Sequence, residues 1–592
     1  MKKRIKALVA LLLVFSILGL SIGCAGQDEN QDRETVQGKL KPGTYEASAK
    51  GHGGDVTAKV TVTEEKISDI KIDASEETPS LAEGAAKEIT SRILDTQSLD
   101  VEAVSGATIS STAMIKAITK ALEKAGADIE DLRDAGNDQD GDQVNQKDLD
   151  VDVVVVGAGG AGMSAAIEVA EAGDSVVVVE KMPLVGGNTN LATGGINAAE
   201  TKYQEQAGIE DSKETFYQDT MEGGHNKNDP ELLHTLVDNA PDAVEWLNEM
   251  GANLTRVTLS GGATNPRIHT PADGSPVGPV IVKVLSNKLE KLGVDILLNT
   301  KATKLIEKDG TVTGIVAEDE NQNEFNINAK AVILATGGFG ANSKMVEKYR
   351  PDLKGFSTTN HKGATGDGII MAKEVGADLT DIEEIQIHPT TDPETGYLFT
   401  EGLRGDGAIL INNEGRRFID ELETRDVVSQ NILKQPGGTA YLITNEEMRK
   451  ENASLAGYIE NDYAIKAEDI EDLAEKLDMN KDTLQDTMET YAENVKAGVD
   501  KEFGREHLTQ SLEEGPYYAL KVTPGIHHTM GGLKIDPKTH VINTEGESIK
   551  GLYAAGEVGG GVHGGNRIGG NAVADIIVFG RIAGQTASEE LK

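Results

Sequence analysis

Cysteine is almost absent from this sequence, because Cys24 is the only one among 592 residues. A lone cysteine cannot form an internal disulfide, a four-cysteine iron–sulfur site or a C-x-x-C-H haem attachment. We therefore expect no metal site, and any redox chemistry must use a flavin or a nicotinamide.

Basic residues are also few, since 57 Lys and Arg stand against 98 Asp and Glu, for a formal net charge of -41. This charge argues against nucleic acid and against an anionic membrane surface as partners. An anionic substrate would need a locally basic pocket inside the acidic shell.

The amino terminus has the pattern of a lipoprotein signal. A basic start at residues 2–4 precedes an apolar stretch over residues 7–20, which is short for a membrane span, and Gly23 stands before Cys24. The pattern predicts a signal peptide over residues 1–24 with lipid on Cys24; the weaker alternative is an ordinary secretory signal with an incidental cysteine. More than one acyl chain gives stable attachment. We expect an exported protein anchored by lipid to the cell membrane, facing outside the cytoplasm.

Composition divides the rest of the chain into four parts. Residues 25–38 are polar and predict a flexible tether. Residues 39–126 combine alternating strand patterns with two helical patterns, which predicts a small α+β domain. Residues 127–149 are acidic and predict a linker. Residues 150–592 contain short apolar runs followed by glycine or an acid, which is typical of buried parallel strands in an α/β domain.

A dinucleotide fingerprint opens the large domain. The apolar run 151–156 leads into Gly157, Gly159 and Gly162, a helical segment follows, and the next strand ends at Glu180. Gly157 permits a tight turn, Gly159 lets the backbone approach a pyrophosphate, and Gly162 lets helix and strand pack closely. The helix N-terminus would face the pyrophosphate, and Glu180 would accept hydrogen bonds from ribose.

Three further segments favour FAD over NAD. They lie at residues 186–195, 335–340 and 551–557, and each joins glycines to polar or acidic residues. An acid in the last segment suits the ribityl chain of a flavin. The candidate FAD-binding residues in these segments are Asn188, Thr189, Gly194, Gly195, Gly337 and Glu557.

From Asp150 onward the sequence resembles the FAD-dependent family of flavocytochrome-type fumarate reductases and urocanate reductases. The resemblance implies a Rossmann-like FAD-binding domain, with FAD held non-covalently, and an inserted capping domain over roughly residues 385–460. It adds Asn571 and Ala572 to the FAD-binding residues. Besides the fingerprint, it rests on residues 186–197, 386–390, 399–405, 423–426, 524–532 and 564–571.

Residues 39–126 resemble the small FMN-binding domain of respiratory flavoproteins, through Ser105-Gly106-Ala107-Thr108. The resemblance implies that a flavin transferase joins FMN covalently through its phosphate to a hydroxyl, for which we favour Thr108, with Ser111 and Thr112 as alternatives. The alternative is that Ser110, Ser111 or Thr112 only caps the helix that follows, and both can hold together. Some relatives carry multihaem domains, and the FMN domain would replace them here.

The resemblance also implies a pocket for a small dicarboxylate. His527 and Arg567 would hold one carboxylate, with Arg567 suited to bidentate contact. His388 and Thr400 would hold the other and twist it out of plane, which weakens conjugation and favours hydride addition. His528 would support these residues from behind.

Arg425 would donate the proton that completes the reduction. Arginine does not ordinarily titrate in proteins, but the carbanion-like carbon left by hydride addition is a strong base. Glu401 and Arg404 would resupply the proton, and the alternative is a structural salt bridge.

The predicted reaction is reduction of fumarate to succinate, with electrons relayed by FMN from a membrane electron-transfer chain. Urocanate-type relatives carry Tyr and Asp where this chain has Ile387 and Gly402. Because Ile387 and Gly402 bring no negative charge, nothing at these positions would repel the second carboxylate of fumarate. Open alternatives are another enoate, such as urocanate, acrylate or an aryl-acrylate; a flavin electron-carrier lipoprotein; and a dehydrogenase, for example of a ketosteroid.

Overall fold

The computed structural model describes residues 40–592, apart from residues 52–53, 76, 78, 102, 105–106 and 135–146. The predicted signal peptide, Cys24 and the tether lie outside the described residues. Among the residues described, no helix is both long and apolar enough to cross a membrane.

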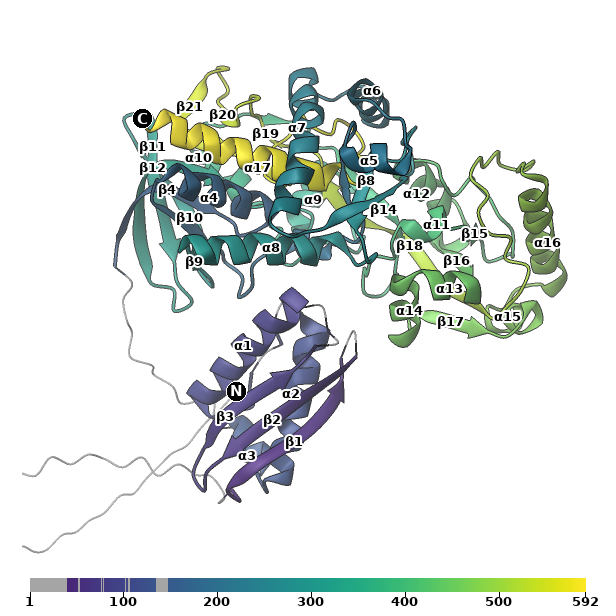
Figure 1. Ribbon diagram of the computed structural model, residues 1–592, viewed down its shortest axis with the longest axis horizontal. Helices are drawn as coiled ribbons and strands as arrows, with labels where there is room; N and C mark the ends of the chain where they lie inside the picture. The colour runs from purple at the N-terminus through teal and green to yellow at the C-terminus, as the bar shows by residue number, and fades with distance from the viewer. Residues whose placement is uncertain are drawn as a thin grey trace, which may run out of the picture.

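The N-terminal domain is a three-stranded antiparallel sheet packed against helices (Figure 1). Alternate side chains of its strands are buried, as the sequence pattern predicts for a sheet with one covered face. Its elements are β1 (Gly43–Lys50), β2 (Asp55–Val62), β3 (Ile67–Asp73), α1 (Pro79–Thr96) and α2 (Thr108–Lys124).

The predicted linker over residues 127–149 is shorter than expected, because its first part folds onto this domain as α3 (Ile129–Asp134). Leu132 is buried there in the domain core. Its carbonyl accepts hydrogen bonds from the Leu99 amide at 2.9 Å and the Ser98 hydroxyl at 2.9 Å. Apolar residues in an acidic segment, Leu132 together with Ala127 and Ile129, thus hold this helical turn against the domain.

The large domain is built on an eight-stranded sheet whose central strands run parallel. Its central valines are buried, which agrees with their continuous apolar runs. Helices α4 (Gly160–Ala172), α8 (Val277–Leu292) and α17 (Asn571–Glu590) pack together beside it (Figure 1). The strands are β10 (Lys301–Lys308), β11 (Thr311–Glu318), β21 (Ser548–Ala554), β12 (Glu324–Leu334), β4 (Leu149–Val156), β5 (Val176–Val179) and β9 (Asp295–Leu297), with β20 (His540–Ile542) paired to β21.

Shorter elements surround this sheet. They are η2 (Gly187–Leu191), β6 (Ile196–Asn197), α5 (Lys202–Ala207), α6 (Lys213–Gly223), α7 (Pro230–Glu249), β7 (Leu254–Thr258), β8 (Ile268–Pro271), α9 (Ser343–Tyr349), η3 (Pro351–Leu353), α10 (Asp367–Glu374), β13 (Leu379–Thr380), β19 (Gly532–Leu533) and η5 (Gly556–Val558).

A capping unit with its own hydrophobic core is inserted into the large domain and forms one end of the molecule in Figure 1. Its core runs from Phe399 to Val522, so the unit continues beyond the expected end at residue 460. The charged helices at residues 470–476 and 481–497 bury apolar side chains in this core. The elements are β14 (Ile385–Thr391), α11 (Gly402–Gly405), β15 (Ile409–Ile411), α12 (Arg425–Leu433), η4 (Pro436–Gly438), β16 (Ala440–Asn445), α13 (Glu446–Glu451), α14 (Ala453–Glu460), β17 (Ala464–Ala467), α15 (Ile470–Lys476), α16 (Lys481–Ala497) and β18 (Tyr517–Thr529).

A buried ion cluster stabilises the capping unit. Glu421 is fully buried and accepts hydrogen bonds from Arg417 Nε and Nη2, both at 2.9 Å, and from Arg505 Nη1 at 3.0 Å. Arg417 also pairs with buried Asp500 at 3.0 Å. Arg505 Nη2 donates to the Arg404 carbonyl at 2.5 Å, which joins the cluster to a predicted catalytic residue.

We expect Glu421→Ala to destabilise the capping unit by about 3–5 kcal/mol, because it leaves two buried guanidinium groups without this carboxylate. Chemical unfolding followed by circular dichroism measures the effect. Glu460→Ala, at an exposed position on α14, is the control and should leave the transition in place. Equal behaviour of the two variants would contradict a structural role for the cluster.

Candidate active site

The fingerprint glycines form a cradle at the end of β4. Gly157 has φ +107°, and a Cβ there would lie 2.4 Å from the Ala335 carbonyl oxygen. A Cβ on Gly162 would lie 1.8 Å from the Gly157 carbonyl oxygen. Gly159 is the N-cap of α4 and offers no side chain. At Gly157 and Gly162 only glycine permits this approach of turn, helix and neighbouring strand, as the fingerprint predicts.

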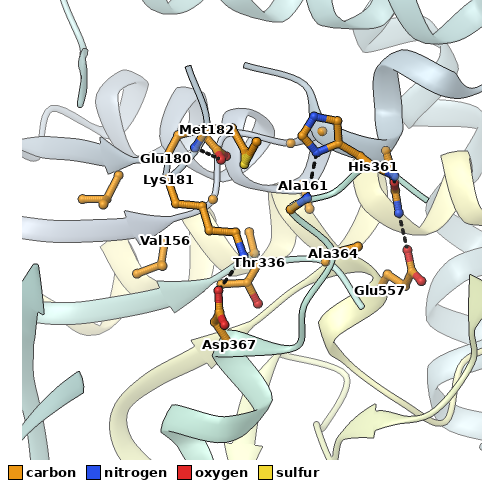
Figure 2. A pocket seen from close by; sticks show the side chains of 18 of the residues that line it. Val156, Ala161, Glu180, Lys181, Met182, Thr336, His361, Ala364, Asp367 and Glu557 are labelled. Carbon is orange, nitrogen blue, oxygen red and sulfur yellow. Dashed lines mark hydrogen bonds and ion pairs between the residues drawn. The ribbon is translucent and has the colours of Figure 1, made fainter. Parts of the chain in front are cut away.

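Glu180 follows β5 and points into the pocket beside this cradle (Figure 2). Its carboxylate accepts hydrogen bonds from the Ala158 amide at 2.8 Å and the Met182 amide at 2.9 Å. Burial raises the pKa of Glu180. The next residue, Lys181, pairs with Asp367 at 2.5 Å across the pocket.

The pocket receives residues from seven separate stretches of chain. Among the predicted ligands, Gly157, Gly159, Glu180, Asn188, Thr189, Gly337 and Glu557 line it. Lys181, Met182, Thr336, His361 and Asp367 also line it and were not predicted. The sequence signal for Lys181 and Met182 is their position directly after Glu180; His361 and Asp367 belong to no motif.

The other predicted FAD-binding residues are not among those that line the pocket. Gly162 packs beneath the cradle, and a Cβ on Gly195 would lie 2.3 Å from the His269 carbonyl oxygen. Asn571 is buried, accepting from Asn197 at 2.6 Å and donating to the Thr220 hydroxyl at 3.1 Å. Gly194 and Ala572 are likewise outside the lining.

These residues fit an extended dinucleotide. Gly187 and Gly337 have positive φ and open space where a Cβ would stand, so their backbone is accessible to a ligand. The hydroxyl of Thr336 lines the pocket and is buried with no hydrogen-bond partner within the described part of the chain. Glu557 is held by the Thr529 amide and hydroxyl, both at 3.0 Å, with Asn188 at 3.5 Å.

Strands β14 and β18 bring the two predicted carboxylate-binding histidines together. The register shifts where Gln386 lies opposite His528 and Ile387 opposite Ile526, which leaves His527 between these two pairs. The rings of His388 and His527 stand 5.1 Å apart. Burial, and then the positive charge of Arg425, hold the pKa of each histidine well below its ordinary value. Both rings are therefore neutral at pH 7 and act as hydrogen-bonding groups.

Hydrogen bonds orient these rings. The Thr390 amide donates to His388 Nδ1 at 3.3 Å, which leaves Nε2 as the donor to a ligand. His527 Nδ1 lies 2.8 Å from the Thr359 hydroxyl. Thr400 is buried, and its amide donates to the Tyr458 hydroxyl at 3.0 Å.

Arg567 has spare hydrogen-bonding capacity. Its Nη1 donates to the Ile568 carbonyl at 3.1 Å, while its Nε is buried with no partner among the residues described. Burial, and then repulsion from Arg425, lower the pKa of Arg567 to about 9. A bound carboxylate would satisfy the guanidinium and relieve this repulsion.

Arg425, Glu401 and Arg404 form a continuous chain. Arg425 donates to Glu401 Oε2 from Nη2 at 2.6 Å and from Nε at 3.0 Å, and Arg404 Nη2 donates to Oε1 at 2.8 Å. Glu401 is the N-cap of α11, so Arg404 follows it by one turn. Burial alone would raise the pKa of Glu401, but the two arginines outweigh it and lower it to about 2.

Gln386 connects the two halves of this site and was not predicted as a site residue. Its Oε1 accepts from Arg425 Nη1 at 3.0 Å, and its Nε2 donates to the Arg567 carbonyl at 2.8 Å. Gly569 packs against the same groups, since a Cβ there would lie 3.1 Å from Glu401 Oε2. The motif around His388 contains Gln386, but only the fold shows its partners.

His528 lies beside this site rather than in it. Its ring stands 5.3 Å from that of His563, which is 3.2 Å from the buried Asp575 carboxylate. Burial holds the pKa of His528 well below its ordinary value.

Comparisons with known proteins identify two families along the chain. The family described as "FAD binding domain" matches residues 152–573, and "FMN-binding domain" matches residues 51–123. An NADH:fumarate oxidoreductase of Klebsiella pneumoniae is 44% identical over 563 residues, covering 95% of this chain and 60% of that protein. The chain thus spans less than two thirds of that relative's length.

Two further relatives match the large domain. A fumarate reductase (cytochrome) of Shewanella frigidimarina is 46% identical over 433 residues, covering 73% of this chain and 76% of that protein. A solved flavocytochrome c3 fumarate reductase in an open conformation superposes with a TM-score of 0.66 at 43% identity, covering 75% of this chain and 79% of that one. The chain belongs to the family of FAD-binding oxidoreductases that includes these fumarate reductases, and it carries an FMN-binding domain before its FAD-binding domain.

Proposed function

We propose that the protein reduces the carbon–carbon double bond of a small unsaturated dicarboxylate, fumarate, to give succinate. The observation that carries this proposal is the arrangement of His388, His527 and Arg567 around the Arg425–Glu401–Arg404 chain. The similarity to proteins named fumarate reductase supports it. An electron carrier would not need such a carboxylate pocket.

The bound FAD would supply a hydride to one alkene carbon. Arg567 and His527 hold the carboxylate at one end, and His388 and Thr400 hold the other. Because both histidines are neutral, they donate hydrogen bonds, and most of the positive charge facing the dianion comes from the arginines.

Arg425 gives a proton to the second alkene carbon, so that one hydride and one proton are added in total. Glu401 is ionised at neutral pH, because its pKa is about 2. It therefore does not store the proton but passes it from Arg404 to Arg425, with both guanidinium groups within hydrogen-bond distance.

Arg425→Ala should abolish turnover while FAD and fumarate still bind. Steady-state assays with reduced viologen measure turnover, and flavin absorbance with a fumarate titration measures binding. Arg449→Ala on α13, whose arginine pairs with Glu446 away from the site, is the matched control and should keep full activity. If Arg425→Ala keeps more than one tenth of the wild-type turnover, its activation free energy has changed by less than about 1.4 kcal/mol, and the proton-donor role is excluded.

We expect kcat/KM for fumarate to fall above about pH 9, because Arg567 carries its charge below that pKa and loses it above. The pH dependence of kcat/KM reports the ionisation of groups in the free enzyme, and the decline should approach about tenfold per pH unit. Fumarate stays doubly ionised over this range, so the substrate adds no titration. The Arg567→Lys variant should shift the decline, and a profile that stays flat to about pH 10 in both proteins contradicts the assignment.

The pocket should prefer fumarate to urocanate and acrylate in kcat/KM. Ile387 and Gly402 add no charge or side-chain hydrogen bond at the end where His388 and Thr400 stand, so a second carboxylate meets only donors there. A mono-acid leaves those donors unpaired. Sites built to hydrogen-bond a substrate group discriminate strongly against analogues that lack the group. His388→Ala should therefore reduce kcat/KM more for fumarate than for any mono-acid. A higher value for urocanate or acrylate in the viologen assay would refute this account of the pocket.

We also propose that FMN is joined covalently at Thr108. Thr108 is the first residue of α2, and the N-cap Ala107 has no side chain that could cap the helix, so its N-terminal amides suit a phosphate. Ser111 is a poor alternative, because its buried hydroxyl bonds the Ala107 carbonyl at 2.8 Å and the Val104 amide at 2.9 Å.

Mass spectrometry of the exported protein tests this attachment. The wild type should carry one FMN adduct, Thr108→Ala should lose it, and Thr112→Ala should retain it as the control. An unchanged mass of the Thr108 variant, or loss of the adduct only in Thr112→Ala, would move the attachment elsewhere.

Lipid on Cys24, export and electron supply from a membrane chain complete the proposal, together with a flavin transferase that loads FMN. Their support is the sequence pattern of residues 1–24. Labelling with a radioactive fatty acid should mark the wild type and not Cys24→Ser; equal labelling would exclude this anchor.

A further inference from the structure

Leu184 of the large domain packs against the hydrophobic core of the FMN-binding domain. Opposite it stands Gly84 in the second turn of α1, where a Cβ would lie only 2.5 Å from Leu184 Cδ2. Glycine inside a helix lowers the stability of the helix relative to alanine. The close approach of Leu184 explains why a glycine stands at this position. Helix α1 also contacts α8, and in Figure 1 one end of α1 points toward α8.

The loop that carries Leu184 also builds the FAD pocket. Glu180, Lys181 and Met182 line the pocket just before Leu184, and residues 186–189 line it just after. Leu184 is therefore an apolar contact on a segment whose neighbours on both sides would touch the bound FAD.

On the FMN-binding domain, the contact lies at the end that carries the proposed attachment. Helices α1 and α2 begin at the same end, because Glu77, just before α1, accepts a hydrogen bond from the Ser110 hydroxyl in the first turn of α2. Gly84 is in the second turn of α1 and Thr108 opens α2. The FMN end of the small domain thus faces the loop that lines the FAD pocket.

We infer that the contact between Gly84 on α1 and Leu184 on the β5–η2 loop is the docking surface through which the FMN-binding domain passes electrons to FAD. This inference rests on the proposed function. Two electrons leave reduced FMN and reduce FAD for each double bond, and each flavin exchanges its protons with water. Gly84 leaves room for the Leu184 side chain at this contact, because a Cβ there would meet Leu184 Cδ2.

A cysteine pair tests the docked arrangement without relying on catalysis. Gly84→Cys and Leu184→Cys are introduced into the full chain together with Cys24→Ser, so that the pair are the only cysteines. Mild oxidation should form an intramolecular disulfide at least about tenfold faster than in the control pair Gly84→Cys and Glu545→Cys, whose second residue lies on the β20–β21 turn. Equal rates would overturn the inference.

The cross-linked protein then tests electron transfer. After reduction with a reduced viologen, fumarate should reoxidise both flavins at the same rate with the disulfide closed or opened. If the closed form reoxidises FAD but leaves FMN reduced, and opening the disulfide restores FMN oxidation, the docked arrangement is not the transfer arrangement. Failure of FAD itself to be reoxidised by fumarate would count against the proposed function instead, so the two failures are distinguishable.

Discussion

The pairing of β14 with β18 is the constraint on which the candidate active site depends. Strand β18 pairs with β16 and β17 in the capping unit through its first half and with β14 through its second half. Ile385 of β14 and Ile526 of β18 pack in the core of the large domain, so this ladder ties the capping unit to that domain and sets His388 beside His527. A shift of one residue in this register would turn the side chains of either strand to the opposite face.

Burial and charge oppose each other in this site. Arg425, Arg404 and Arg567 are removed from water, and Glu401 is the carboxylate that bonds two of them. Burying like charges is costly, and here it lowers the pKa of Arg567 and both histidines. A dianion that enters the site would offset this cost. The locally basic pocket can therefore attract an anion although the whole chain has a formal net charge of -41.

The buried ion cluster around Glu421 holds Arg404 in place. Arg404 donates from Nη1 to the Glu421 carbonyl at 2.6 Å, and its own carbonyl is held by Arg505. The inner arginine is thus fixed on both sides, which lets its Nη2 face Glu401. The capping unit consequently supplies rigid support for one end of the hydrogen-bonded chain of Arg404, Glu401 and Arg425.

The sequence by itself determined the features that depend on local spacing. The fingerprint glycines, Glu180, the α/β class and the motifs carrying Arg425, His388 and His527 follow from residues within a few positions of one another, and a strand, turn or helix imposes such spacing directly. Tertiary structure alone decided that Leu132 turns part of a linker into a helix, that the capping unit reaches Val522, that Gln386 bridges two arginines, and that Leu184 meets Gly84. These outcomes depend on side chains that are far apart in sequence and meet only when apolar surface is buried, so no local pattern encodes them.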